Sequence, residues 1–146
     1  MKPLDDAVAA VEAALRAGSD AGIDFVLNAR TDAFLTAGPD ADRPVVLQEA
    51  VTRGRAFLEA GAPVVFVPGV VAREEIAALV DGLGPGRLTL ISVPGRSLPA
   101  REMQELGVAR VSTGPFTQRV ALTALQDAVV DMVAGGTLPA GTRALN

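Results

Sequence analysis

The sequence predicts an α/β fold of about four strand–helix units preceded by a helix. Short apolar runs bounded by glycine and proline alternate with segments of helical periodicity along the chain. The runs are apolar on both faces, as in parallel sheets covered by helices. The 146 residues allow one domain at most, whereas a complete (β/α)₈ barrel needs about 250. We therefore expect residues 1–146 to form a single half-barrel domain.

The N-terminal elements are predicted to be a helix, a strand and a loop. Apolar residues at helical spacing predict a first helix that ends near residues 17–21; they are Leu4, Val8, Val11 and Leu15. Residues 25–29 follow as a strand. Two prolines, a glycine and alternating charges predict a loop over residues 37–44.

Helical periodicity resumes over residues 46–58 and predicts a second helix, with Glu49 and Arg53 placed for an ion pair on its outer face. Gly61 lies where a C-terminal cap is expected. The later elements are a strand over 64–67, a helix over 72–83, a strand over 88–93, a short helix over 98–106, a strand over 109–112 and a last helix opened by 113–115. That last helix carries a broad apolar stripe, and residues 135–146 read as a loop.

Composition excludes several classes of function. The net charge of −4 and a pI of about 4.8, with no basic patch, predict no nucleic-acid partner. Every apolar run is too short for a membrane helix, so no membrane association is expected. The N-terminus resembles neither a signal peptide nor a transit peptide, so a cytoplasmic location is the default expectation.

The residue types that are absent narrow the chemistry. The chain has no cysteine and no histidine, and Lys2 is its only lysine. Histidine acid–base catalysis, thiolate nucleophiles and a buried lysine Schiff base are thereby excluded. Carboxylates, arginines, hydroxyls, backbone amides or a metal held by oxygen remain, and the sequence does not identify a catalytic residue.

The most informative segment is 24–35, where a strand-like apolar run ends in Arg30, Thr31 and Asp32. Ligands of parallel α/β proteins bind at the carboxyl ends of strands, so Arg30 is placed to bind an anionic substrate, with Asp32 as a possible additional site residue. Arg96, after a later strand, is a looser second cation. The alternative is an Arg30–Asp32 pair that only fixes a loop.

A second anion-binding feature is the turn formed by Ser112, Thr113 and Gly114 before the last helix. Free backbone amides and the helix dipole at such a position favour a phosphate or a carboxylate. We therefore name these three residues, with Arg30, as the substrate-binding candidates. Ordinary helix N-capping by Ser112 or Thr113 is the alternative.

Three motifs resemble the isocitrate lyase and phosphoenolpyruvate mutase (phosphonomutase) superfamily. The run N-A-R-T-D-A-F resembles that family's fifth strand, E-A-G-A-P-V-V-F-V-P-G-V over 59–70 its sixth, and L-G-V-A-R-V-S-T-G-P over 106–115 its eighth. The motifs occur in the family's order and cover nearly the whole chain. The resemblance therefore implies the C-terminal half of a (β/α)₈ barrel of the TIM type.

The resemblance also implies a function. Family members act on small 2-oxo or 2-hydroxy acids or phosphonates with Mg²⁺, through C–C or P–C bond chemistry, and Arg30 matches their substrate-contacting arginine. Their metal-binding carboxylates lie on earlier strands, which have no counterpart here. Pro68-Gly69 and Val93-Pro94 replace a common glutamate and asparagine. We therefore expect the Mg²⁺ cofactor only if its ligands come from elsewhere, and no metal site built by this chain, whose remaining candidates are Asp32, Asp40 and Asp42.

Half a barrel leaves two strand edges and one sheet face without a partner. We therefore expect a homo-oligomer or a complementary half-barrel as partner, besides a small anionic substrate. Two functions stay open. The first is a lyase or phosphonomutase-like domain that is incomplete, and inactive, without missing N-terminal strands; the second is a truncated, non-catalytic family member that serves as a structural or association module.

Overall fold

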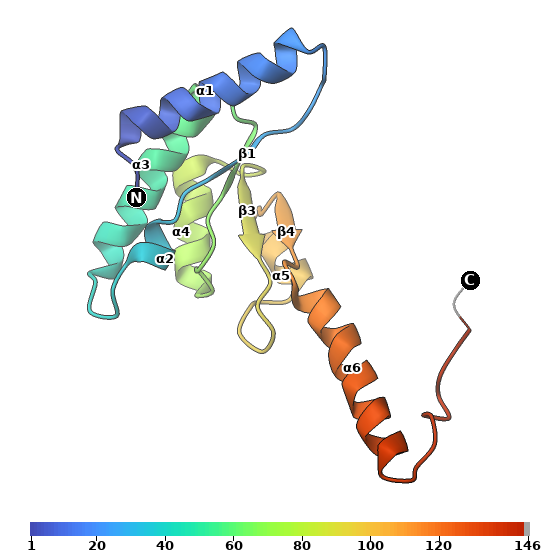
Figure 1. Cartoon of the computed structure of the whole chain (residues 1–146). Coiled ribbons are helices and arrows are strands. Elements are labelled where there is room, and N and C mark those ends of the chain that lie inside the picture. Colours follow the sequence, from blue (N-terminus) through green and yellow to red (C-terminus); the bar gives the residue numbers. More distant parts are fainter. Residues whose placement is uncertain (145–146) are drawn as a thin grey trace. The chain divides into compact units, whose positions relative to one another are not determined.

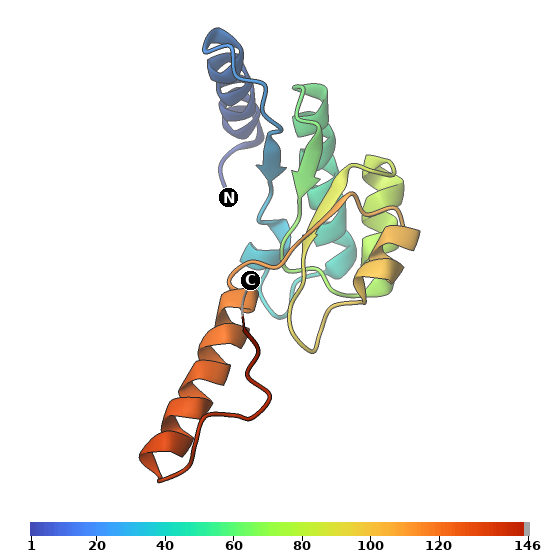
Figure 2. The ribbon, with the colours of Figure 1, turned by 90° about the vertical axis from the view of Figure 1, so that its right-hand side faces the viewer.

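A computed structural model describes residues 1–144 and divides the chain into two compact units, residues 1–112 and 113–146 (Figures 1 and 2). The first unit contains all four strands and five of the helices. The second contains one long helix and the C-terminal segment. Each unit is described by itself below.

The first unit is built on a four-stranded parallel sheet in the order β1-β2-β3-β4. The strands are β1 (Asn28–Arg30), β2 (Val64–Phe66), β3 (Leu88–Ile91) and β4 (Arg110–Ser112). Consecutive parallel strands joined through helices are the repeating unit of the α/β barrel. The predicted α/β half-barrel is thereby confirmed in its strand order and direction.

The helices of the first unit lie between and before the strands. They are α1 (Leu4–Asp20), α2 (Ala33–Thr36), α3 (Arg43–Glu59), α4 (Arg73–Leu83) and α5 (Ala100–Glu105). Gly61, with φ of 103°, adopts the left-handed conformation expected after α3. No helix within residues 1–144 is long and apolar enough to cross a membrane.

Two predicted boundaries were wrong, and one helix was missed. The first strand begins at Asn28 rather than at residue 25, because pairing starts where Asn28 meets Val64, and Phe25 and Val26 are exposed. The loop predicted over 37–44 ends earlier, since Pro44 occupies the first turn of α3, where its missing N–H costs nothing. The short helix α2 was not predicted.

One face of the sheet packs against α3 and α4 (Figure 2). Val65 points to this side, because its Cγ1 lies 3.4 Å from the position a Cβ would take on Gly54 of α3. Ala29 and Leu88 pair with Val65 in register and are buried on the same side. Successive strand residues alternate between faces, so the next residue of each strand points to the opposite side.

We call that opposite side the inner face. It carries the register row Arg30, Phe66, Thr89 and Arg110, one residue from each strand. Three of these four side chains are polar, so the inner face is not the purely apolar surface that a half-barrel suggests. The core lies on the helix side instead, where the apolar side chains of α4 predicted to face inward are buried, namely Ile76, Leu79, Val80 and Leu83.

Helices α3 and α4 are held together by close packing and by an ion pair. A Cβ on Gly82 of α4 would lie 2.7 Å from Cγ2 of Val51 on α3, so only glycine fits there. The Arg43 guanidinium donates two hydrogen bonds of 2.7 Å to Glu75, and this interaction raises the pKa of Arg43. The two helices thereby pack as one layer behind the sheet.

In the second unit, α6 (Phe116–Val133) has no buried side chain. The stripe expected on this helix is apolar as predicted, but its large side chains are exposed, namely Val120, Leu125, Val129, Met132 and Val133. A helix with most of its large apolar side chains exposed gains little free energy from burial, and such an exposed apolar stripe is typical of a surface that packs against a partner.

Candidate anion-binding site

Arg30 is the last residue of β1, and its guanidinium makes two contacts. Nε donates a 2.6 Å hydrogen bond to Oδ1 of Asp32, and Cζ lies 5.7 Å from the ring centroid of Phe66 on the neighbouring strand. The pair with Asp32, considered above as an alternative, therefore exists. It uses only Nε, and neither Nη atom has a partner within residues 1–144. The outer edge of the guanidinium remains available for a two-pronged contact with an anion.

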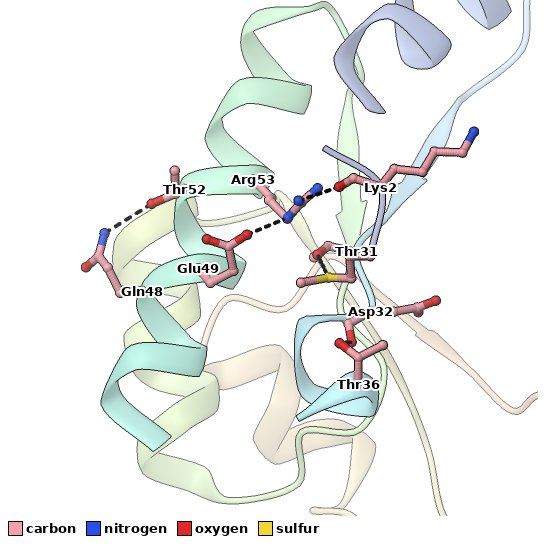
Figure 3. A network of polar contacts seen from close by, with 9 residues as sticks. Lys2, Thr31, Asp32, Thr36, Gln48, Glu49, Thr52 and Arg53 are labelled. Carbon is pink, nitrogen blue, oxygen red and sulfur yellow. Dashed lines mark hydrogen bonds and ion pairs between the residues drawn. The ribbon is translucent and has the colours of Figure 1, made fainter. Parts of the chain in front are cut away.

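The segment after Arg30 is fixed by backbone interactions. The Thr31 amide donates to the Phe66 carbonyl at 3.0 Å, which extends the β1–β2 pairing by one residue. The Asp32 carbonyl accepts hydrogen bonds from the amide and hydroxyl of Thr36, so α2 anchors this residue (Figure 3). Asp32 is thereby positioned to orient the Arg30 side chain.

A pocket of about 170 Å³ lies beside Arg30 at the edge of β1, lined also by Thr31, Asp32, Lys2 and Arg53. Sequence reasoning missed Arg53 as part of this region, since it was expected on the outer face of its helix. It pairs with Glu49 as predicted, at 2.6 Å, but it is only 8% exposed. A signal was present, because position 53 lies one helical turn before the buried Phe57.

Arg53 is buried because it fastens the N-terminal segment. Its Nη2 donates a 2.7 Å hydrogen bond to the Lys2 carbonyl, and Figure 3 shows the side chain reaching from α3 toward that atom. The Thr31 hydroxyl contacts Sδ of Met1 at 3.9 Å. Residues 1–2 therefore form one wall of the pocket beside Arg30.

The structure does not bring Arg30 and Ser112 close together. They end β1 and β4, the two outer strands of the sheet, and three strand spacings separate such positions by about 14 Å. Arg96 lies exposed in the turn after β3. A shared site for these three residues stays a prediction.

Thr113 and Gly114 form the turn before α6 in the second unit, and Gly114 has φ of 51°. The alternative prediction, that Ser112 or Thr113 caps α6, was wrong. The N-cap residue is Pro115, and no side-chain hydrogen bond caps the helix. The Thr113 carbonyl accepts from the Phe116 amide instead, at 3.1 Å. An anion-binding role for this turn is untested.

The described residues do not fit a magnesium site. Within 1–144 no three His, Cys, Asp or Glu side chains gather closely enough to hold a metal ion. Asp32 is engaged by Arg30. Asp40 and Asp42 are surface residues between α2 and α3. No reaction step through a metal is therefore derived from this chain.

A parallel sheet of four strands joined through helices belongs to the class of α/β-barrel domains, in which active sites lie at the carboxyl ends of the strands. The chain is a member of the phosphoenolpyruvate phosphomutase family, whose model matches residues 1–133. The resemblance to the phosphoenolpyruvate mutase and isocitrate lyase superfamily is thereby confirmed.

Three relatives illustrate this membership. Oxaloacetate decarboxylase of Paraburkholderia xenovorans (strain LB400) is 34% identical over 134 residues, which are 92% of this chain and 41% of that protein. A crystal structure provisionally assigned as a phosphonomutase, from Burkholderia cenocepacia J2315, has a TM-score of 0.80 and 34% identity over 89% of this chain and 51% of its own. Oxaloacetate acetylhydrolase in complex with the product oxalate has a TM-score of 0.80 and 29% identity, over 98% and 47% respectively.

The chain thus spans about half the length of the proteins that it matches. This agrees with a sheet of four strands where a complete barrel has eight. The relatives are lyases and mutases, and their activities belong to the longer proteins.

Proposed function

We propose that this chain supplies the anion-binding half of a lyase or phosphonomutase-like active site. Its substrates would be small 2-oxo or 2-hydroxy acids or phosphonates, with C–C or P–C bond chemistry as the reaction type. One observation carries the proposal: Asp32 holds Arg30 at the end of β1 through Nε, while neither Nη atom has a partner among the residues that the structure describes, 1–144. A guanidinium in this state is ready for a carboxylate or phosphonate.

The catalytic half would come from elsewhere. Superfamily chemistry implies Mg²⁺, and within residues 1–144 no three His, Cys, Asp or Glu side chains gather closely enough to hold a metal ion, so its ligands would belong to another segment or another chain. A homo-oligomer or a complementary half-barrel would provide such residues and would cover the inner face. The alternative function, a non-catalytic association module, is favoured by the exposed apolar side chains of α6.

Binding and turnover of the 146-residue chain separate the two functions. Calorimetric titration with oxalate and with phosphonoacetate, and turnover of oxaloacetate with Mg²⁺, would be measured on the same preparation. The proposal expects anion binding without turnover. An association module would bind neither anion, and turnover by the isolated chain would show that no other half is needed.

A further inference from the structure

The two outer strands of the sheet, β1 and β4, each have a neighbour on one side only. All four strands are parallel and follow one another in chain order, so they make up half of the eight strands that close an α/β barrel. A two-fold axis along the barrel sets β4 of each copy beside β1 of the other, and we call each such pairing a seam. Both edges of both copies are then paired, so the assembly closes and does not grow into a fibre.

The strands are staggered in the direction that this closure requires. In the register row Arg110, the first residue of β4, is level with Arg30, the last residue of β1, so β4 begins where β1 ends. An eight-stranded barrel of this type has a shear of about 8 residues, which is about four residues for four strands. If the same stagger continues across the seam, Arg110 meets the partner's β1 segment about four residues before Arg30, at Val26.

The segment that this register selects is exposed. Residues 23–27 lead from α1 into β1 and belong to no helix or strand (Figure 2). The side chains of Ile23 and Val26 are 61% and 72% exposed, and Phe25 is also exposed. Large exposed apolar side chains next to an unpaired strand edge are typical of a surface that pairs with another chain. This is also the segment whose composition predicted a strand from residue 25.

The helix side of the seam offers an apolar pocket at the same register. The pocket, of about 290 Å³, lies between α1 and β1, and its walls include Leu27 and the small side chains of Ala10 and Ala14. Val111 pairs with the buried Leu90 and therefore points to the helix side of β4. In the staggered register Val111 of one copy lies beside the partner's Leu27, where its side chain can fill this pocket.

Charges on the inner face favour the same register. A seam without the stagger would set Arg110 directly beside the partner's Arg30, and like charges opposite each other on neighbouring strands are destabilising. With the stagger, Arg110 lies beside Val26, and Asp24 comes two residues earlier on the same face by alternation. Both charged residues are exposed within one chain. A diagonal neighbour is within reach of a long side chain, so the guanidinium and the carboxylate attract each other across the seam.

We infer that two copies of this chain close one eight-stranded barrel, in which residues 110–112 of each copy pair with residues 26–28 of the other. The second copy is thereby the other half of the proposed function, and the inference rests on that function for the idea that two halves form one site. The closure sets the partner's Ser112 beside Asn28, two residues before Arg30, whereas three strand spacings of about 14 Å in total separate Ser112 from Arg30 within one chain. The carboxyl rim then contains strand ends of both copies.

Engineered cysteines test the register directly, because the chain has no cysteine of its own. Val26→Cys and Arg110→Cys, made as separate single variants of the full chain, would be mixed, left to exchange and oxidised with copper phenanthroline. Neighbouring strands hold such Cα atoms about 5 Å apart, which a disulfide can span. Arg101→Cys mixed with Val26→Cys is the control for random collision, since the Arg101 side chain on α5 is 90% accessible.

We expect a covalent dimer on non-reducing gels from the mixture of Val26→Cys and Arg110→Cys, and little from either variant alone. In the closed barrel two copies of the same cysteine lie on opposite sides, out of reach of each other. A mixture that crosslinks no more than the Arg101→Cys control overturns the inference. Association of the copies would in that case use another surface, such as the exposed stripe of α6.

A charge at the seam gives a second, independent measurement. Val26→Lys sets a positive charge beside the partner's Arg110 and should raise the dimer Kd, measured by sedimentation, about tenfold or more. Val45→Lys is the matched control, because Val45 on α3 is 63% exposed and lies outside the seam. The two variants should have the same melting temperature in dilute, monomeric samples. Equal dimer Kd values for the two variants, or a wild-type chain that stays monomeric at high micromolar concentration, overturn the inference.

The inference and the proposed function fail separately. Titration of the same samples with oxalate reports on anion binding, and crosslinking reports on the seam. A dimer that crosslinks as expected but binds no oxalate refutes the proposed function and leaves the barrel closure standing. A monomer that binds oxalate does the reverse.

Discussion

Replacing Arg30 with lysine separates a binding role from a structural one. The Arg30–Asp32 pair is exposed, with 51% and 40% of the two side chains accessible. Exposed pairs contribute about 0.2–1 kcal/mol, so Arg30→Lys should cost less than about 1 kcal/mol of unfolding free energy. Lysine keeps the charge but cannot reproduce the two-pronged geometry of the open Nη edge.

The expected effect on binding is larger. Losing one charge-assisted hydrogen bond costs about 1.5–3 kcal/mol, which corresponds to a rise of about 10- to 150-fold in the Kd for oxalate or phosphonoacetate. Calorimetry gives this Kd, and thermal melts of the same samples give stability. Arg16→Lys is the matched control, since Arg16 forms an exposed pair with Glu12 on α1. A clear drop in melting temperature with unchanged anion affinity would show that Arg30 serves only to hold Asp32.

Three further predictions concern metal, association and packing. Calorimetry should find only millimolar or weaker Mg²⁺ binding to the isolated chain, because no three potential ligands gather within residues 1–144; a micromolar site would mean that Asp32, Asp40 or Asp42 has taken over. Light scattering should show an oligomer, since burying about 1,000 Å² of mainly apolar surface is worth about 25 kcal/mol before the costs of association, and a soluble monomer at high micromolar concentration contradicts this. Gly82→Ala should destabilise the fold by about 1–3 kcal/mol in urea unfolding, because the new Cβ would lie 2.7 Å from buried Val51. Gly38→Ala, where nothing lies within 4 Å, is its control, and equal stability of the two variants would refute the steric argument.

The sequence predicted the order of the elements because each strand is short, apolar and bounded by glycine or proline. It placed the start of β1 too early, because residues 25–27 have the composition of a strand. Hydrogen bonding to a neighbour defines a strand, and pairing with β2 begins only at Asn28. Composition alone does not contain that information.

The surroundings of the candidate site could be anticipated only in part, for a similar reason. Arg30 was proposed because a polar cluster directly follows an apolar run, which is a local signal. Arg53 was assigned to the wrong face because a charged residue in an ion pair is usually solvated, whereas here the Lys2 carbonyl, 51 residues earlier, accepts its hydrogen bond. Helical periodicity describes only neighbouring residues, so it cannot predict a hydrogen-bond partner that is so distant in sequence.

The positions of Arg30, Thr89 and Arg110 depend on strand register, which the local sequence does not predict. Each residue is ordinary in its own segment, and a shift of one residue in any strand would turn its side chain to the helix side. The parallel pairing fixes all of them on the inner face, where Thr89 is buried and its Oγ1 has no hydrogen-bond partner within residues 1–144. Because the apolar core on the other side of the sheet fixes that register, the packing of Val65 and Leu88 against the helices also determines which polar side chains lie on the inner face.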